Sequence, residues 1–262
     1  MTFSLSWLPR VLIDAGLKVA EVPGWLNRGA GDVGPVKGVI CHHTAGAAGG
    51  NMPSLRVITD GRSDLPGPLS QLALGRDGTF FVVAAGRANH AGRGEWQGVT
   101  SGNTSFIGIE AENTGTEPWP AAQLDAYQRG VAAILKHLGL GAGMACGHKE
   151  YALPNGRKPD PHTIDMNVFR QRVAGIMAGT VAPPVPIPAT DATGRLTLRR
   201  RSETNPKLLV KDVQRKLGMA ADKITGTFGP ITEARVREFQ RGKGLNPDGI
   251  VGPDTWKALD AA

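Results

Sequence analysis

The sequence predicts an α/β protein, with a mixed central β-sheet flanked by helices, followed by a small all-α domain of three helices. The first part of the chain mixes apolar strand patterns with stretches of helical periodicity. A proline-rich segment at 182–188 then interrupts both patterns and is typical of a semi-rigid linker. Beyond it, a glycine-rich turn occurs twice, each time before a helix start. We therefore assign residues 1–178 to the first domain, 179–197 to the linker and 198–262 to the second domain.

The first domain is expected to contain, in chain order, an amphipathic helix at 1–16, a buried strand at 38–41, a hairpin of strands 71–74 and 80–83, a strand at 107–110, and helices at 120–139 and 167–177. The turn dipeptide Asp77–Gly78 predicts the hairpin. The long helix has Pro120 at an early position, apolar residues at helical spacing and Gly139 as a stop signal. The N-terminal segment lacks an uninterrupted apolar core with a cleavage site, so we interpret it as a helix rather than a secretion signal, and no membrane span is evident.

The second domain contains an internal repeat. The segment Gly226–Thr232 recurs at Gly249–Thr255, 23 residues further along the chain. Apolar residues at helical spacing predict three helices, at 209–217, 233–243 and 254–259. We expect these helices to pack around one shared apolar core.

Two histidines and an aspartate occupy positions that suit metal binding. His42 ends the buried strand, and His148 precedes a loop punctuated by proline and glycine, which must fold back on itself. Asp160 lies in this loop. Zinc takes imidazole nitrogen and carboxylate oxygen in a tetrahedral shell, and a catalytic zinc keeps one position for water. Each histidine alone is more often a structural group than a ligand, but the three residues together predict a zinc site.

These stretches resemble the family of N-acetylmuramoyl-L-alanine amidases, which includes phage endolysins, bacterial muropeptide amidases and peptidoglycan recognition proteins. The resemblance covers roughly residues 36–173. Three motifs carry it: Val39–Ala45 (VICHHTA), Gly147–Glu150 (GHKE) and Arg157–Pro161 (RKPDP). The resemblance implies the zinc amidase fold for the first domain.

The resemblance also implies a Zn²⁺ ion held by His42, His148 and Asp160. This chain departs from the family pattern directly after the third motif, where His162 replaces a usual glycine. His162 therefore remains an alternative metal ligand.

Further roles are implied by the same matching. Glu110 occupies the place of the catalytic base, and Lys158 matches the lysine that faces the scissile carbonyl. Without the resemblance, Glu110 could be a strand carboxylate paired with an arginine and Lys158 a solvated loop lysine. His90 stands in a segment similar to a cleft-lining element of the family and is expected to contact substrate. Ser70 stands where some relatives have a tyrosine, so we expect the glutamate to act instead.

The remaining histidines and the two cysteines suit structural roles. His43 should point to the opposite face of the strand from His42 and take part in packing or hydrogen bonding. His137 lies near a helix C-terminus, where partial positive charge is favourable. Cys41 and Cys146 are interpreted as buried reduced thiols, because two cysteines do not form a disulfide framework. Whether these two cysteines pair with each other is left open.

The second domain resembles peptidoglycan-binding domains with D-G-x-x-G-x-x-T turns, here Asp248–Thr255. The first copy departs from this pattern, because Thr225 replaces the aspartate. A small helical bundle without a ligand is the alternative.

Together the two resemblances imply a phage endolysin that hydrolyses the amide bond between N-acetylmuramic acid and L-alanine by zinc-activated water. Its expected partner is bacterial peptidoglycan, with neither nucleic acid nor membrane insertion involved. We expect a monomer that resides in the host cytoplasm until lysis and then acts on the cell wall.

Three other functions are compatible with parts of the sequence. A net charge of +7 permits nucleic-acid binding, but the basic residues are dispersed and no nucleic-acid fold signature is present, so a polyanionic cell wall fits at least as well. A non-catalytic recognition protein is disfavoured because the complete ligand set is retained. An amidase that recycles soluble muropeptides is disfavoured because soluble fragments need no wall-binding domain.

Overall fold

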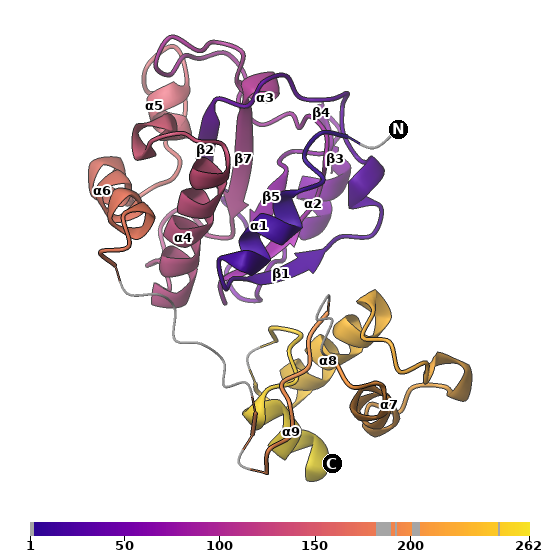
Figure 1. Cartoon of the computed structure of the whole chain (residues 1–262). Coiled ribbons are helices and arrows are strands. Elements are labelled where there is room, and N and C mark those ends of the chain that lie inside the picture. Colours follow the sequence, from indigo (N-terminus) through magenta and orange to yellow (C-terminus); the bar gives the residue numbers. More distant parts are fainter. Residues whose placement is uncertain (1–2, 182–189, 192, 201–204, 246) are drawn as a thin grey trace. The chain divides into compact units, whose positions relative to one another are not determined.

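The computed structural model describes residues 3–181, 190–191, 193–200, 205–245 and 247–262. The chain divides into two compact units, Met1–Pro184 and Val185–Ala262. Unit 1 is built on one six-stranded sheet and unit 2 on helices, which confirms the predicted fold class (Figure 1). No helix within the described ranges is long and apolar enough to cross a membrane.

The central sheet of unit 1 has the strand order β1-β6-β5-β7-β2-β8. Its strands are β1 (Lys18–Glu21), β2 (Gly38–His43), β5 (Leu72–Leu74), β6 (Thr79–Val82), β7 (Phe106–Ala111) and β8 (Ala145–Gly147). Only β5 and β6 pair antiparallel, and the other neighbours are parallel. A separate two-stranded ribbon joins β3 (Gly61–Arg62) to β4 (Leu65–Pro66).

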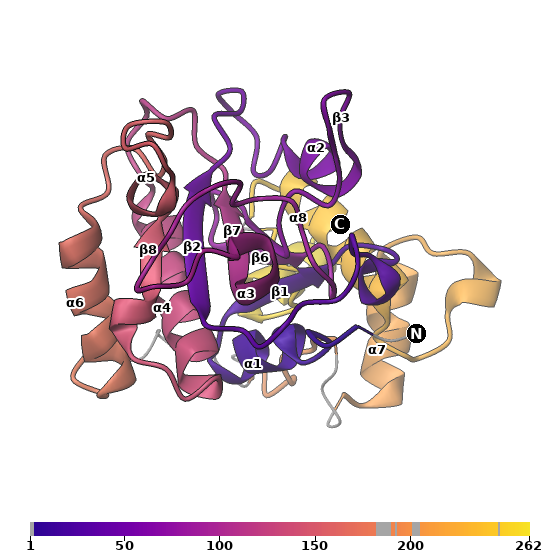
Figure 2. The ribbon, with the colours of Figure 1, turned by 90° about the horizontal axis from the view of Figure 1, so that it is seen from above.

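Helices cover both faces of the sheet. The main hydrophobic core lies between one face and three helices, α1 (Leu8–Asp14), α4 (Ala121–His137) and α6 (Met166–Met177). Figure 2 shows α6 at the end of the sheet next to β8. The shorter helices are α2 (Leu55–Asp60), α3 (Gly102–Ser105) and α5 (His148–Tyr151). Smaller apolar clusters pack against the other face, where α2 and α5 contribute Ile58 and Tyr151.

The predicted elements of unit 1 are largely confirmed. The hairpin forms as expected, and Gly78 adopts a φ of 80°, which favours glycine. The long helix α4 ends just before Gly139, which has a φ of 67°. The N-terminal helix is shorter than predicted, because turns occupy residues 4–7. Strand β1 was missed, since it is a short edge strand whose residues are mostly half-buried and show no clear alternation.

The described part of unit 2 contains three α-helices, α7 (Lys207–Lys216), α8 (Pro230–Gly242) and α9 (Pro253–Asp260). Their common core consists of Leu198, Val210, Val213, Phe228, Val236, Val251, Trp256 and Leu259. The predicted linker segment 182–188 lies outside the described residues. The end of the predicted linker, however, packs on unit 2, because Trp256 Nε1 donates to the carbonyl of Leu196 at 3.1 Å and Arg195 covers the Trp256 ring at 4.5 Å.

A buried glutamine fixes each copy of the repeated turn. Gln240 on α8 accepts from the backbone nitrogen of Gly249 at 2.9 Å and donates to Thr255 Oγ1 at 2.9 Å. Gln214 on α7 makes the corresponding bonds to Gly226 and Thr232, each at 2.9 Å. Both copies of the sequence repeat are therefore held by the same arrangement of glutamine hydrogen bonds.

Thr225, which replaces the aspartate in the first copy of the turn, makes the same type of hydrogen bond to the backbone as Asp248 does in the second copy. Asp248 Oδ1 accepts from the nitrogen of Ile250 at 2.9 Å, and Thr225 Oγ1 accepts from the nitrogen of Thr227 at 3.1 Å. Both side chains bond the backbone two residues on, as is common for turn residues. The departure from the pattern therefore does not disrupt the first turn.

Candidate metal centre and catalytic site

Two of the predicted site residues lie at the carboxyl ends of two neighbouring parallel strands. His42 near the end of β2 and Glu110 near the end of β7 are partners in the strand register. Side chains at paired positions point to the same face of a sheet. This face is opposite α4, because the neighbouring residues Cys41 and Ile109 belong to the core beneath that helix.

Three of the predicted residues form a compact cluster. His148 begins α5 directly after β8, and Asp160 comes from the loop that follows α5. The Nδ1 atoms of His42 and His148 lie 3.0 Å apart, and each lies 3.1 Å from Oδ2 of Asp160. All three residues are buried, and they are the one such group of potential ligands found among the described residues.

Backbone carbonyls determine which ring nitrogens carry hydrogen. A carbonyl oxygen only accepts, so His148 Nε2 carries a hydrogen and donates to Ala91 O at 3.0 Å, which is the tautomer whose Nδ1 offers the lone pair that a metal ligand needs. Likewise His90 Nε2 donates to Phe106 O at 3.2 Å. His90 Nδ1 then accepts from His42 Nε2 at 3.1 Å, which leaves a lone pair on His42 Nδ1. Burial, with the nearby His148, lowers the pKa of His42 to about 4, so this ring is neutral at pH 7.

This tautomer assignment provides a test of whether the cluster suits a metal. Two imidazole lone pairs and a carboxylate oxygen face one another at 3.0–3.1 Å with no hydrogen between them. These electron-rich atoms repel each other unless a cation lies among them. Two nitrogens and one oxygen are donors that zinc accepts, and three protein ligands are typical of a catalytic zinc site. The cluster therefore fits a zinc ion.

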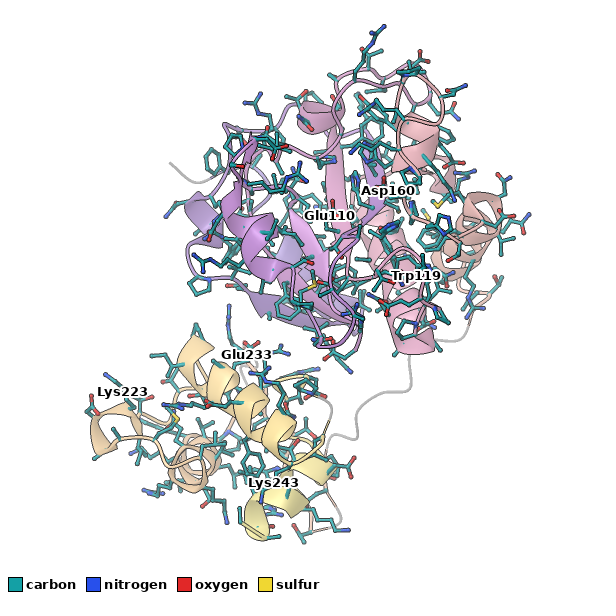
Figure 3. All side chains as sticks on the ribbon, turned by 180° about the vertical axis from the view of Figure 1, so that it is seen from behind. Glu110, Trp119, Asp160, Lys223, Glu233 and Lys243 are labelled. Carbon is teal, nitrogen blue, oxygen red and sulfur yellow. The ribbon has the colours of Figure 1, made fainter. Side chains whose placement is uncertain are left out.

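Glu110 lies beside the cluster and is partly buried (Figure 3). Its Oε2 atom is buried and has no hydrogen-bond partner in the described part of the chain. Burial and the charge of Asp160 raise the pKa of Glu110 to about 8, although Lys158 opposes this shift. The arginine ion pair considered as an alternative is not found for Glu110 among the described residues. A carboxyl group in this environment can exchange a proton near neutral pH.

Lys158 lies in the same loop as Asp160 and is half-buried. Its charge lowers the pKa of both Glu110 and His42, so it is close to the cluster. It makes no hydrogen bond or ion pair with any residue that the structure describes. Its ammonium group is therefore available to interact with a ligand at the cluster.

His90 has a different environment from the expected cleft-lining one. Only 8% of its surface is exposed, and both of its ring nitrogens are bonded within the protein. Its ring packs against β7 at Gly108, where an added Cβ would lie 2.7 Å from the ring. This geometry favours a role for His90 in orienting the ring of His42, while the predicted substrate contact stays a prediction.

The structure also shows the surroundings of the remaining histidines, the two cysteines and Ser70. His43 accepts at Nδ1 from the nitrogen of His162 at 2.9 Å, which is the predicted hydrogen-bonding role. The side chain of His162 is exposed and does not belong to the ligand cluster. Cys41 and Cys146 are buried free thiols. Ser70 is buried and donates to the carbonyl of Leu72 at 2.8 Å, so its hydroxyl group is already engaged.

Sequence reasoning missed several residues that support the site. The hydroxyl of Tyr127 on α4 lies 3.0 Å from the carbonyl oxygen of His42. Gln71 Oε1 accepts from the nitrogen of Gly108 at 2.7 Å. Glu112 is fully buried and accepts from Thr44 and Ser54, which fixes the glycine-rich loop after His42. Helical periodicity identified Tyr127 as a core residue, but no local signal identifies bonds between such distant positions.

Family models match both units. A model described as N-acetylmuramoyl-L-alanine amidase matches residues 32–163, and one described as a peptidoglycan binding domain matches residues 209–259. One curated relative, named as an uncharacterized protein in the bpoA1 3′ region of Kitasatospora aureofaciens, is 46% identical over 54 residues. That match covers 21% of this chain and 46% of the relative, so the chain spans just under half of the relative's length.

Several solved structures are similar to this chain. A selenomethionine derivative of AmpD is 23% identical with a TM-score of 0.48, covering 66% of this chain and 99% of that one. AmiD from E. coli, in complex with anhydro-N-acetylmuramic acid-L-Ala-D-γ-Glu-L-Lys, is 17% identical with a TM-score of 0.45, covering 92% and 95%. The Ph2119 endolysin from a Thermus scotoductus bacteriophage is 17% identical with a TM-score of 0.45, covering 59% and 98%.

The amidase model spans just over half of the chain and includes His42, Glu110, His148, Lys158 and Asp160. The chain belongs to the N-acetylmuramoyl-L-alanine amidase family.

Proposed function

We propose that this protein is a zinc-dependent amidase that hydrolyses the bond between N-acetylmuramic acid and L-alanine in bacterial peptidoglycan. The observation that carries the proposal is the set of three lone pairs of His42, His148 and Asp160, which face one another beside the carboxyl group of Glu110. Family membership supports the choice of substrate.

The roles of the residues follow from their positions. His42, His148 and Asp160 would hold the ion. Bound zinc supplies Lewis-acid polarisation of the carbonyl and a water of lowered pKa. Glu110 accepts the proton of the attacking water and returns it to the leaving amine, because its carboxyl group lies beside the cluster and its Oε2 atom has no hydrogen-bond partner among the described residues. The ammonium group of Lys158 stabilises the negative charge that develops on the carbonyl oxygen.

Unit 2 adds affinity for the polymer. Its match to a peptidoglycan binding domain supports a role in holding the catalytic unit on the wall. Tethering of this kind raises the effective substrate concentration without a new contact at the reacting bond. The net charge of +7 is favourable on an anionic wall. A catalytic unit joined to such a unit suits a phage endolysin that stays in the host cytoplasm until lysis and then acts on the wall as a monomer.

Zinc binding and wall clearance test this proposal together. The purified protein should bind one Zn²⁺ ion and clear a peptidoglycan suspension, and a chelator should abolish the clearance until zinc is added back. His42→Ala and Asp160→Ala should lose both properties. His162→Ala is the matched control, because its side chain is exposed outside the cluster, and it should keep both.

Two results would contradict the proposal. Clearance that persists after complete zinc removal would exclude the metal mechanism. Zinc binding and tight wall binding without any cleavage would favour a recognition protein without turnover.

A further inference from the structure

We propose that Lys149 and Trp119 are positioning residues that hold the loop of Asp160 in its ligand geometry and thereby set the affinity for the metal. This inference rests on the proposed zinc site. It concerns the segment 160–164, here called the aspartate loop. Neither side chain bonds a ligand atom of the cluster, and neither residue was given a role by the sequence patterns.

Lys149 ties the aspartate loop to the helix that carries His148. Its ammonium group donates to the carbonyl oxygen of Pro161 at 3.0 Å and to that of Ile164 at 2.7 Å. Its backbone nitrogen donates to the carbonyl of Asp160 at 2.7 Å. Because Lys149 directly follows His148, these three bonds fix the distance between two ligands of the cluster.

Trp119 holds the loop from another direction. Its indole nitrogen lies 3.1 Å from the carbonyl oxygen of His162 and 3.1 Å from the hydroxyl oxygen of Thr163. A third contact comes from His43, which accepts from the nitrogen of His162 at 2.9 Å and directly follows the ligand His42.

The loop depends on these contacts because its backbone is unfavourable by itself. Thr163 has a φ of 59°, a left-handed conformation that a β-branched residue rarely adopts. Such a conformation persists only where surrounding groups enforce it. Lys149 and Trp119 bond the residues on both sides of Thr163 and Thr163 itself.

The consequence for metal binding follows from preorganisation. A carboxylate that is already in place binds a cation without the entropy cost of ordering its loop. Groups that orient metal ligands typically change metal affinity by about 10–100-fold when they are removed. Loss of Lys149 or Trp119 should therefore weaken zinc binding while the hydrophobic core of unit 1 remains intact.

The test compares two substitutions with two matched controls. Lys149→Met removes the ammonium group but keeps an unbranched stem, and Trp119→Phe removes the indole nitrogen but keeps an aromatic ring. The controls are Lys136→Met, at an exposed lysine of α4, and Trp7→Phe, at a tryptophan that stacks on His137 away from the cluster. For each full-length protein, the zinc dissociation constant is measured by competition with a chromophoric chelator, and metal-free thermal unfolding is followed by circular dichroism.

Lys149→Met should raise the zinc dissociation constant about 10–100-fold. Trp119→Phe should raise it about fivefold, as expected for one neutral hydrogen bond. Both controls should stay within twofold of the wild type.

Dissociation constants within twofold of the wild type for both variants would overturn the inference, even if the variants unfold at lower temperature. If Lys149→Met does not fold, an unchanged constant for Trp119→Phe overturns it. Failure of the wild type to bind zinc would instead contradict the metal site and the inference with it.

Discussion

At the scale of single residues, the hydrogen-bond acceptors behind the histidines determine which ring nitrogens are free to bind a metal. Sequence patterns predicted His42, His148 and Asp160 as a set, but not which ring nitrogens face inward. The carbonyl oxygens of Ala91 and Phe106 decide this, because they force hydrogen onto the outer nitrogens. These bonds join positions far apart in sequence, so no local pattern could predict them.

The role of His90 can be tested by substitution. His90→Phe keeps a ring against Gly108 but removes the acceptor for His42 Nε2. Zinc affinity should fall about 10–100-fold, because the orientation of a ligand is lost. Titration of zinc into the variant and the wild type measures this. An unchanged zinc affinity with a higher KM for soluble muropeptide would instead support a substrate contact.

Glu110→Gln should separate catalysis from metal binding. The amide cannot accept a proton, so kcat should fall by about 10²–10⁴-fold. Zinc affinity should change little, because Glu110 is not one of the three clustered ligands. Hydrolysis of a soluble muropeptide and zinc titration provide the two measurements. Substantial turnover in this variant would exclude Glu110 as the proton acceptor.

The same residue predicts a pH dependence of the metal-free protein. The folded-state pKa of Glu110, about 8, lies above its ordinary value of 4.5. The folded state therefore keeps a proton that the unfolded state releases, and Glu110 makes the free energy of unfolding decrease as pH rises from about 4.5 to 8. Urea unfolding at pH 5 and pH 8 should show a smaller decrease for Glu110→Gln than for the wild type. Equal decreases would refute the buried-acid assignment.

At the scale of elements, close approach of β7 to His90 explains why glycine stands at position 108. The sequence predicted the strand and the position of Glu110 on it, since alternation is a local property. The sequence could not predict that the ring of His90 packs against Gly108, because His90 lies in a loop far from β7 in the sequence. For a similar reason β1 was missed, as its place in the sheet depends on pairing with β6 rather than on its own pattern.

Gly108→Ala tests this contact. The new methyl group would lie 2.7 Å from the His90 ring, so the ring must move and the orientation of His42 should be lost. We expect a loss of about 1–3 kcal/mol in unfolding free energy, typical of overpacking, together with weaker zinc binding. Gly143→Ala is the control, because an added Cβ there meets nothing within 4 Å. Normal zinc affinity in Gly108→Ala would contradict the orienting role of this contact.

At the scale of the whole molecule, two compact units correspond to two family matches. The change in composition and the repeat predicted this organisation, because both are visible along the sequence. The contacts of Arg195 and Leu196 with Trp256 were not predictable, since they form only in the folded chain. The proline-rich composition shows where the first domain's sequence pattern ends, but the start of unit 2 depends on which residues pack on its core.

Truncation tests the division of labour between the units. A protein that ends at Pro188 should cleave soluble muropeptide with a kcat/KM close to that of the full chain, because the cluster belongs to unit 1. Its binding to intact walls, measured by co-sedimentation, should weaken by about 10²-fold if unit 2 acts as a tether. Equal wall binding by both proteins would show that unit 2 does not anchor the enzyme.

The identity of the cleaved bond tests the central claim most directly. Peptidoglycan is digested with the zinc-loaded protein and with the chelated protein, and the products are identified by mass spectrometry. An amidase with the proposed metal site should release free stem peptides that begin with L-alanine, alongside intact glycan strands, only when the metal is present. Cut glycan, cut peptide cross-links, or the same products from the chelated protein would contradict it.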